Sequence, residues 1–288
     1  MVERVDHVLG APDGGACRIT RVGGLTAKRA PVVLMHGMFT DRRFWLSDRD
    51  IGLAAYLAER GHQVYILQRR GLSDGPDCGR ARLGLVEHMT YDVPAMDDWV
   101  AARHDQPAFW IGHSFGGVTA ARALARHVAP DRLGGLVLLA SQYQHAKRML
   151  DWPGHILTRG LVRLRGHLPA RSVGLGPVDE PAAAARDACD WVAQGRRSGL
   201  IRDDLARLAC PLLAVSGSAD RVDPTAGCRA FASATASRDS TFIEAGVAHG
   251  YARDYDHPGI VISKDAQREI WPLIGDWLAA RSQGVSSS

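Results

Sequence analysis

Short apolar runs alternate with helical patterns along most of this chain, and this alternation constrains its fold more than any other feature. Several of the runs are apolar throughout, as expected of strands that are covered on both faces of a parallel sheet. The alternation predicts an α/β fold, with a doubly wound, mostly parallel sheet and helices on each face. The predicted strands are 17–22, 31–36, 63–68, 108–112, 133–140, 211–217 and 240–245, and the predicted helices lie near 50–60, 88–103, 115–127, 224–235 and 264–281.

One interval between predicted strands is too long for a simple crossover. About 70 residues separate the strands at 133–140 and 211–217, whereas a crossover needs only about 10–12. We expect residues 142–205 to form a helical lid over the sheet edge where active sites lie in such folds. Residues 1–141 and 206–282 would then form the core, and 283–288 a flexible tail. The lid carries six Lys or Arg between His145 and Arg171 against one acid, Asp151, which fits a solvated lid or a surface for anions.

The composition indicates a globular protein. With 288 residues, 46% of them hydrophobic, the chain can bury a substantial core. Its net charge of +4 rests on 35 basic residues that are nearly all Arg, a bias that does not suggest a nucleic-acid surface. The five cysteines form no C-x-x-C pair and fit the reduced thiols of a cytoplasmic protein. We find no signal-peptide pattern and no run of about 18 apolar residues, so we expect no stable membrane insertion.

Residues 108–125 predict a strand, a sharp turn and an Ala-rich helix, with the pattern G-x-S-x-G at the turn. A serine at such a turn presents its hydroxyl clear of both elements, which makes Ser114 the candidate nucleophile. Gly112 and Gly116 allow the strained backbone and the close approach of strand and helix. A second copy of the pattern, at 71–75, is followed by a Gly- and Pro-rich segment instead of a helix, so Ser73 is interpreted as a loop residue.

A serine nucleophile needs a base and an acid that orients the base. In this architecture the chain order is Ser, then Asp or Glu, then His. Asp220 comes first after the strand at 211–217 and is the preferred acid, while Asp223 precedes Pro224 at a helix start and is interpreted as an N-cap. His249, in the loop after the strand at 240–245, is the preferred base. Of the other histidines, His257 is the one rival that needs a test.

The developing negative charge on the substrate needs backbone N–H donors. One donor is expected from Phe115, the residue after the nucleophile. The second is expected from the loop after the strand at 31–36, where the N–H of Met38 follows the flexible Gly37. The alternative interpretation of His36-Gly37 is a simple turn that ends the strand.

The segments VVLMHGM, WIGHSFGG, SGSADRVDP and GVAHG together resemble the α/β-hydrolase superfamily over nearly the full chain. Residues 32–71 are similar to the acid lipase branch, and the lid segment HLPARSVGLG resembles bacterial predicted α/β-hydrolases whose substrates are unassigned. The resemblance implies an ester hydrolase with Ser114, Asp220 and His249 as its triad. It also places Met38 and Phe115 at the oxyanion positions.

These features predict a cytoplasmic, cofactor-free serine hydrolase that cleaves carboxylic esters of small molecules, with no metal and no nucleic-acid partner. An acyltransferase or thioesterase that uses the same acyl-enzyme is an alternative. A binding protein on a hydrolase scaffold is a third possibility, because fold alone does not imply function. The sequence indicates neither the acyl-chain length nor the oligomeric state.

Overall fold

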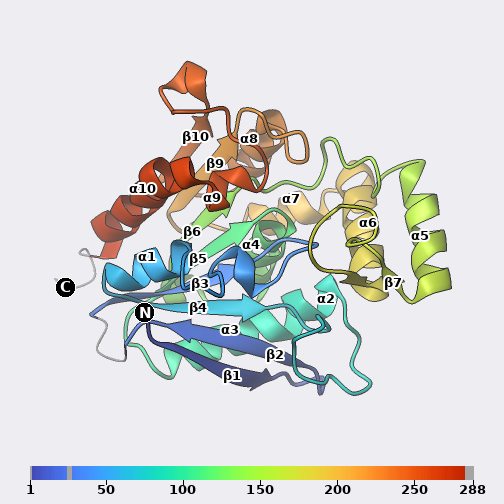
Figure 1. Ribbon diagram of the computed structural model, residues 1–288, viewed down its shortest axis with the longest axis horizontal. Helices are drawn as coiled ribbons and strands as arrows, with labels where there is room; N and C mark the ends of the chain where they lie inside the picture. Colours follow the sequence, from blue (N-terminus) through green and yellow to red (C-terminus); the bar gives the residue numbers. More distant parts are fainter. Residues whose placement is uncertain (1, 25–27, 283–288) are drawn as a thin grey trace.

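The computed structural model describes residues 2–24 and 28–282, so the predicted tail at 283–288 lies outside the described residues (Figure 1). Its main sheet contains the strands β1 (Arg4–Gly10), β2 (Ala16–Val22), β3 (Arg29–Met35), β4 (His62–Gln68), β5 (Ala108–His113), β6 (Leu133–Leu139), β9 (Leu212–Gly217) and β10 (Ser240–Ala245). The helices that flank the sheet are α1 (Leu53–Glu59), α2 (Leu85–Glu87), α3 (Val93–Ala101), α4 (Phe115–His127), α8 (Thr225–Ser233), α9 (Gly259–Ile262) and α10 (Lys264–Ser282).

The strands form one sheet in the order β1-β2-β4-β3-β5-β6-β9-β10. The six strands from β4 to β10 run parallel to their neighbours, while β2 pairs antiparallel with both β1 and β4. The predicted doubly wound, mostly parallel sheet is therefore confirmed. The sequence reading missed β1, whose alternating charged and apolar residues lie at the edge of the sheet and are mostly exposed.

Two apolar clusters, one on each face of the sheet, form the core. Alternate residues of a strand point to opposite faces, and accordingly Val33 and Met35 join one cluster while Val32 and Leu34 join the other. The first cluster packs against α3, α4 and α8, and the second against α1, α9 and α10. Helices on both faces cover the central strands, which explains why these strands are apolar throughout.

The segment 142–205, which we call the insertion, joins β6 to β9 (Figure 1). It contains α5 (Gly154–Arg165), α6 (Ala182–Arg197) and α7 (Leu200–Leu205), together with a short antiparallel pair, β7 (His167–Leu168) and β8 (Glu180–Pro181). Figure 1 shows α5 and α6 beside the sheet, in yellow-green and yellow at the right of the view. Among the described residues, no helix combines the length and the apolar character that crossing a bilayer requires.

Candidate active site

Ser114 lies at a strained turn between β5 and α4. Its backbone has φ of +55°, a region that residues with a Cβ rarely adopt. The Ser114 N–H donates to Leu139 O at the end of β6 (3.0 Å), which anchors the turn to the neighbouring strand. A Cβ on Gly116 would lie 2.5 Å from the carbonyl oxygen of Met35, so only glycine lets α4 begin this close to β3. Strand, turn and helix thus hold the hydroxyl at the carboxyl ends of the parallel strands.

Asp220 follows β9 and is buried. One carboxylate oxygen, Oδ1, accepts the N–H groups of Val222 and Asp223, both at 2.8 Å, and this fixes the loop. The other oxygen, Oδ2, accepts a hydrogen bond from His257 Nδ1 at 2.8 Å. Asp220 therefore orients an imidazole in the way that a triad acid does.

His257 is brought to Asp220 by a long excursion of the chain after β10. The buried Tyr255 anchors this segment, because its carbonyl accepts the N–H of Ala219 (3.0 Å) and its hydroxyl donates to Glu269 (2.6 Å). His113 Nε2 donates to the carbonyl of His257 (2.9 Å), and the two rings lie 4.5 Å apart. Burial holds the pKa of His113 well below its usual value, which keeps that ring neutral. Nδ1 of His257 faces Asp220, which leaves Nε2 as the nitrogen that can take up a proton.

His249 lies elsewhere. Its side chain is half exposed in the short helical turn Val247–His249, and its Nε2 lies 3.8 Å from Glu244 Oε2. Within the residues that the structure describes, its ion pairs and hydrogen bonds include neither Ser114 nor Asp220. His249 lies away from Ser114 because β10 is an edge strand, and the turn directly after an edge strand lies at the periphery of the sheet.

Asp223 is not the helix N-cap that the sequence predicts. Helix α8 begins after Pro224 without a side-chain cap, and the Asp223 carboxylate is fully buried beside the nucleophile instead. Its Oδ2 accepts a hydrogen bond from Ser114 Oγ at 3.1 Å and lies 3.9 Å from His257 Nδ1. Its Oδ1 accepts Gln142 Nε2 at 2.6 Å and pairs with the buried ammonium of Lys147. Both of these donors belong to the insertion, so tertiary contact and not helix capping determines the place of Asp223.

The loop after β3 lies directly against Ser114. A Cβ built on Gly37 would come within 2.9 Å of Ser114 Cβ, which shows how closely the loop approaches the nucleophile. The N–H groups of Met38 and Phe115 have no acceptor among the described residues. Two free N–H groups close to a serine nucleophile can bind an oxyanion.

The insertion covers the nucleophile. Ser114 is only 7% exposed, and the ring of Trp191 from α6 stacks on Phe115 with 6.5 Å between ring centroids. A cavity of about 620 Å³ lies between the insertion and the loop at 71–83, and another of about 500 Å³ lies between the insertion and α8. Ser114 lines neither of these two cavities. The side chains of Met149, Trp152 and Ile156 are exposed on the insertion and do not line either cavity.

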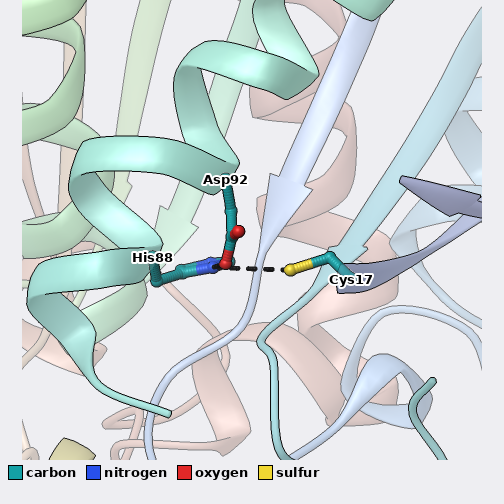
Figure 2. A group of neighbouring side chains, drawn as sticks. All are labelled: Cys17, His88 and Asp92. Carbon is teal, nitrogen blue, oxygen red and sulfur yellow. Dashed lines mark hydrogen bonds and ion pairs between the residues drawn. The ribbon is translucent and has the colours of Figure 1, made fainter. Parts of the chain in front are cut away.

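Cys17, His88 and Asp92 form a buried group with metal-like spacing (Figure 2). His88 Nδ1 lies 2.8 Å from Asp92 Oδ2 and 3.9 Å from Cys17 Sγ. The guanidinium of Arg70 already binds both oxygens of Asp92, so a metal ion there would face a positive charge. Burial and the nearby Asp92 raise the pKa of the Cys17 thiol well above its usual value, whereas a metal ligand must be a thiolate. These residues fit a buried ion-pair network better than a metal centre.

Part of this chain is similar in sequence to a plant lipase. The chain is 32% identical to triacylglycerol lipase 2 of Arabidopsis thaliana over 114 residues, which cover 36% of this chain and 27% of the lipase. The chain thus spans well under half the length of that relative.

Solved structures share the fold. A monoacylglycerol lipase from Paleococcus ferrophilus superposes with a TM-score of 0.64 at 19% identity, over 97% of this chain and 100% of that one. An esterase from Pyrococcus furiosus superposes with a TM-score of 0.67 at 15% identity, over 97% and 91% of the two chains. At such identities the likeness shows the fold alone.

The model of one family matches most of the chain, from residue 26 to residue 256. This match includes the strained turn at Ser114, the loop with Met38 and the turn with Asp220. The expected membership of the α/β-hydrolase superfamily is therefore confirmed, and the chain belongs to the family described as serine aminopeptidase S33.

Proposed function

We propose that this chain is a serine hydrolase that cleaves carboxylic esters of small molecules through an acyl-enzyme intermediate. Ser114 is the nucleophile, His257 the general base and Asp220 the acid that orients it. The proposal rests above all on one observation, the 2.8 Å hydrogen bond from His257 to Asp220 beside the strained turn that carries Ser114. His257 takes the place of His249 in this proposal, because His257 contacts the acid.

The first step is the transfer of the serine proton. In the structure Ser114 Oγ donates to Asp223, which lies beside the ring of His257. The proposed transfer requires rotation about the Cα–Cβ bond of Ser114, which moves the hydroxyl away from Asp223 so that it can donate to Nε2 of His257. His257 then accepts the proton while Oγ attacks the ester carbonyl carbon, and Asp220 stabilises the imidazolium.

The N–H groups of Met38 and Phe115 bind the oxyanion of the tetrahedral intermediate. His257 returns its proton to the alcohol oxygen as the ester bond breaks, which leaves an acyl group on Ser114. A water molecule then gives its proton to His257 and attacks the acyl carbonyl. His257 returns this proton to Ser114 Oγ as the bond between Oγ and the acyl carbon breaks, and the carboxylic acid departs.

The relatives favour esters over amides as substrates. Several are named lipase or esterase, whereas the family description names an aminopeptidase. Both reactions pass through the same acyl-enzyme, so the choice of leaving group must be tested directly.

The test is hydrolysis of p-nitrophenyl esters from acetate to palmitate, with aminoacyl p-nitroanilides as the amide arm. We expect ester turnover that falls by about 10⁴-fold or more in S114A and in H257A, as loss of a triad member does in other serine hydrolases. H249A is the matched control, since it removes an exposed histidine at the end of the neighbouring strand, and it should keep wild-type activity. The chain-length optimum then identifies an esterase or a lipase.

Three results would contradict the proposal. If S114A retained wild-type turnover, Ser114 would not be the nucleophile. If H249A lost activity while H257A kept it, the base would be His249. Faster turnover of the anilides than of the esters would make the protein a peptidase.

Acyl transfer is the alternative that shares the first half of this chemistry. Product analysis with added alcohols or thiols distinguishes it, because a transferase makes the new ester or thioester in preference to the free acid.

A further inference from the structure

Glu180, a buried carboxylate of the insertion, is bound directly to the loop that carries Met38. Its side chain is completely shielded from solvent. One oxygen, Oε1, accepts the backbone N–H of Phe39 at 2.5 Å. Two residues earlier in the insertion, the N–H of Val178 donates to the carbonyl of Phe39 at 3.2 Å. Both polar groups of the Phe39 backbone are therefore held by the insertion, and Phe39 has φ of +64°, which an unsupported residue rarely adopts.

Arg69 also contacts the loop that carries Met38. Its guanidinium pairs with both oxygens of Glu180 at 2.5 and 2.8 Å, and this ion pair is almost fully buried. The same guanidinium donates from Nη2 to the carbonyl of Gly37 at 3.3 Å. His36 adds a second contact, because its Nδ1 lies 2.9 Å from that carbonyl while its Nε2 accepts the N–H of Arg69.

These contacts determine the direction of the Met38 N–H. The carbonyl of Gly37 and the N–H of Met38 belong to one planar trans peptide, so they point in opposite directions. Donors that hold the carbonyl on one side therefore aim the N–H to the other side. The next peptide is held in the same way, since its N–H, that of Phe39, donates to Glu180. Met38 thus lies between two peptide planes. Arg69, His36 and Thr40 hold the carbonyl of the first, and Glu180 holds the N–H of the second.

We propose that Glu180 is a positioning residue, which acts through Arg69 and the Phe39 N–H to aim the Met38 N–H at the oxyanion. The insertion then completes the active site and does more than cover it. This inference rests on the proposed function, because it assumes that Met38 and Phe115 bind the oxyanion of an acyl-transfer reaction. Glu180 itself does not touch the substrate.

A second carboxylate of the insertion offers a matched control. Asp187 on α6 is also buried, and it also accepts an N–H of the core backbone, that of Val86 at 3.1 Å. It pairs with a core arginine, Arg82, at 2.9 Å. Both carboxylates therefore dock the insertion onto the core, but Asp187 contacts the helix at Leu85–Glu87 instead of the loop that carries Met38.

The experiment compares E180A with D187A, and E180Q with D187N, in the full chain. We measure kcat and KM on the best p-nitrophenyl ester and the inhibition constant of an alkylboronic acid, which forms a tetrahedral adduct with a serine. E180A should lower kcat by about 100-fold with KM changed by less than about threefold, the pattern for an interaction made in the transition state. Its affinity for the boronic acid should fall by a similar factor. D187A should keep both quantities within about threefold of wild type.

E180Q keeps an acceptor for Phe39 but weakens the ion pair, so its kcat should fall between those of E180A and wild type. Thermal unfolding of each variant fixes a temperature at which all are folded. Equal effects of E180A and D187A on kcat and boronate affinity at that temperature would overturn the positioning role. If E180A does not fold, the same comparison is made between E180Q and D187N. Equal effects of these two variants on kcat and boronate affinity would overturn the positioning role. Failure of the proposed function is distinct, because turnover and boronate binding would then survive in S114A.

Discussion

Asp223 shows at the scale of one residue how strongly the insertion and the core depend on each other. Its buried carboxylate pairs with the equally buried Lys147. Removing one partner of a buried ion pair leaves an uncompensated charge and costs about 3–5 kcal/mol. We therefore expect K147M to lower the free energy of unfolding by about that amount in urea denaturation, and K147M/D223N to recover most of the loss. A single variant within about 1 kcal/mol of wild type would show that the charge of Asp223 is compensated by other donors.

Two residues show where sequence reasoning about the site succeeds and where it fails. Asp220 lies three residues after the last residue of a predicted strand, Gly217, and such a short loop keeps it at the carboxyl end of the sheet. His257 lies twelve residues after the last residue of β10, Ala245, and nothing local places it at Asp220. Its neighbours Asp254 and Asp256 suggest a surface, yet Tyr255 between them is fully buried. An aromatic residue between two acids is the feature of the sequence that could have indicated that this segment packs against the core.

Among the secondary-structure elements, replacing two helical glycines by alanine should change the stability of the protein in opposite directions. A Cβ on Gly160 in α5 would meet no atom within 4 Å, so G160A should stabilise the protein by about 1 kcal/mol, the difference in helix propensity. A Cβ on Gly116 at the start of α4 would lie 2.5 Å from the backbone oxygen of Met35, so G116A should destabilise it by about 1–3 kcal/mol. Urea denaturation of both variants checks this contrast. Equal effects would mean that α4 can move away from β3 at little cost.

The elements that were predictable are those whose own residues specify them. The central strands are apolar throughout because helices cover both of their faces, and this pattern is visible in the sequence. The edge strand β1 was missed because its exposed residues alternate with half-buried ones and its place depends on pairing with β2. Likewise, Lys147 pairs with Asp223, which lies 76 positions away in the sequence, and Glu180 pairs with Arg69, which lies 111 positions away. No spacing rule predicts contacts of that range.

At the scale of the whole molecule, buried histidines should make stability depend on pH. Burial lowers the pKa of His36, His88 and His113 in the folded protein. In the unfolded chain the same groups titrate near 6.5, so below that pH the unfolded state binds more protons than the folded one. The free energy of unfolding should therefore fall as pH is lowered from about 7 to 5, by up to about 1.4 kcal/mol per pH unit for each histidine. Urea denaturation across this range measures the slope.

Asp97 on α3 acts in the opposite direction and supplies a control. Burial raises the pKa of this carboxyl to about 6 in the folded protein, although Arg132 lies beside it. Between about pH 4 and 6 the folded state then holds a proton that the unfolded state has released, so this group stabilises the protein as pH falls. D97N removes the effect, and its stability should decrease more steeply than that of wild type between pH 6 and 5. Equal slopes in the two proteins between pH 6 and 5 would show that Arg132 keeps Asp97 ionised. A flat profile in both proteins would mean that the buried histidines take up protons without unfolding.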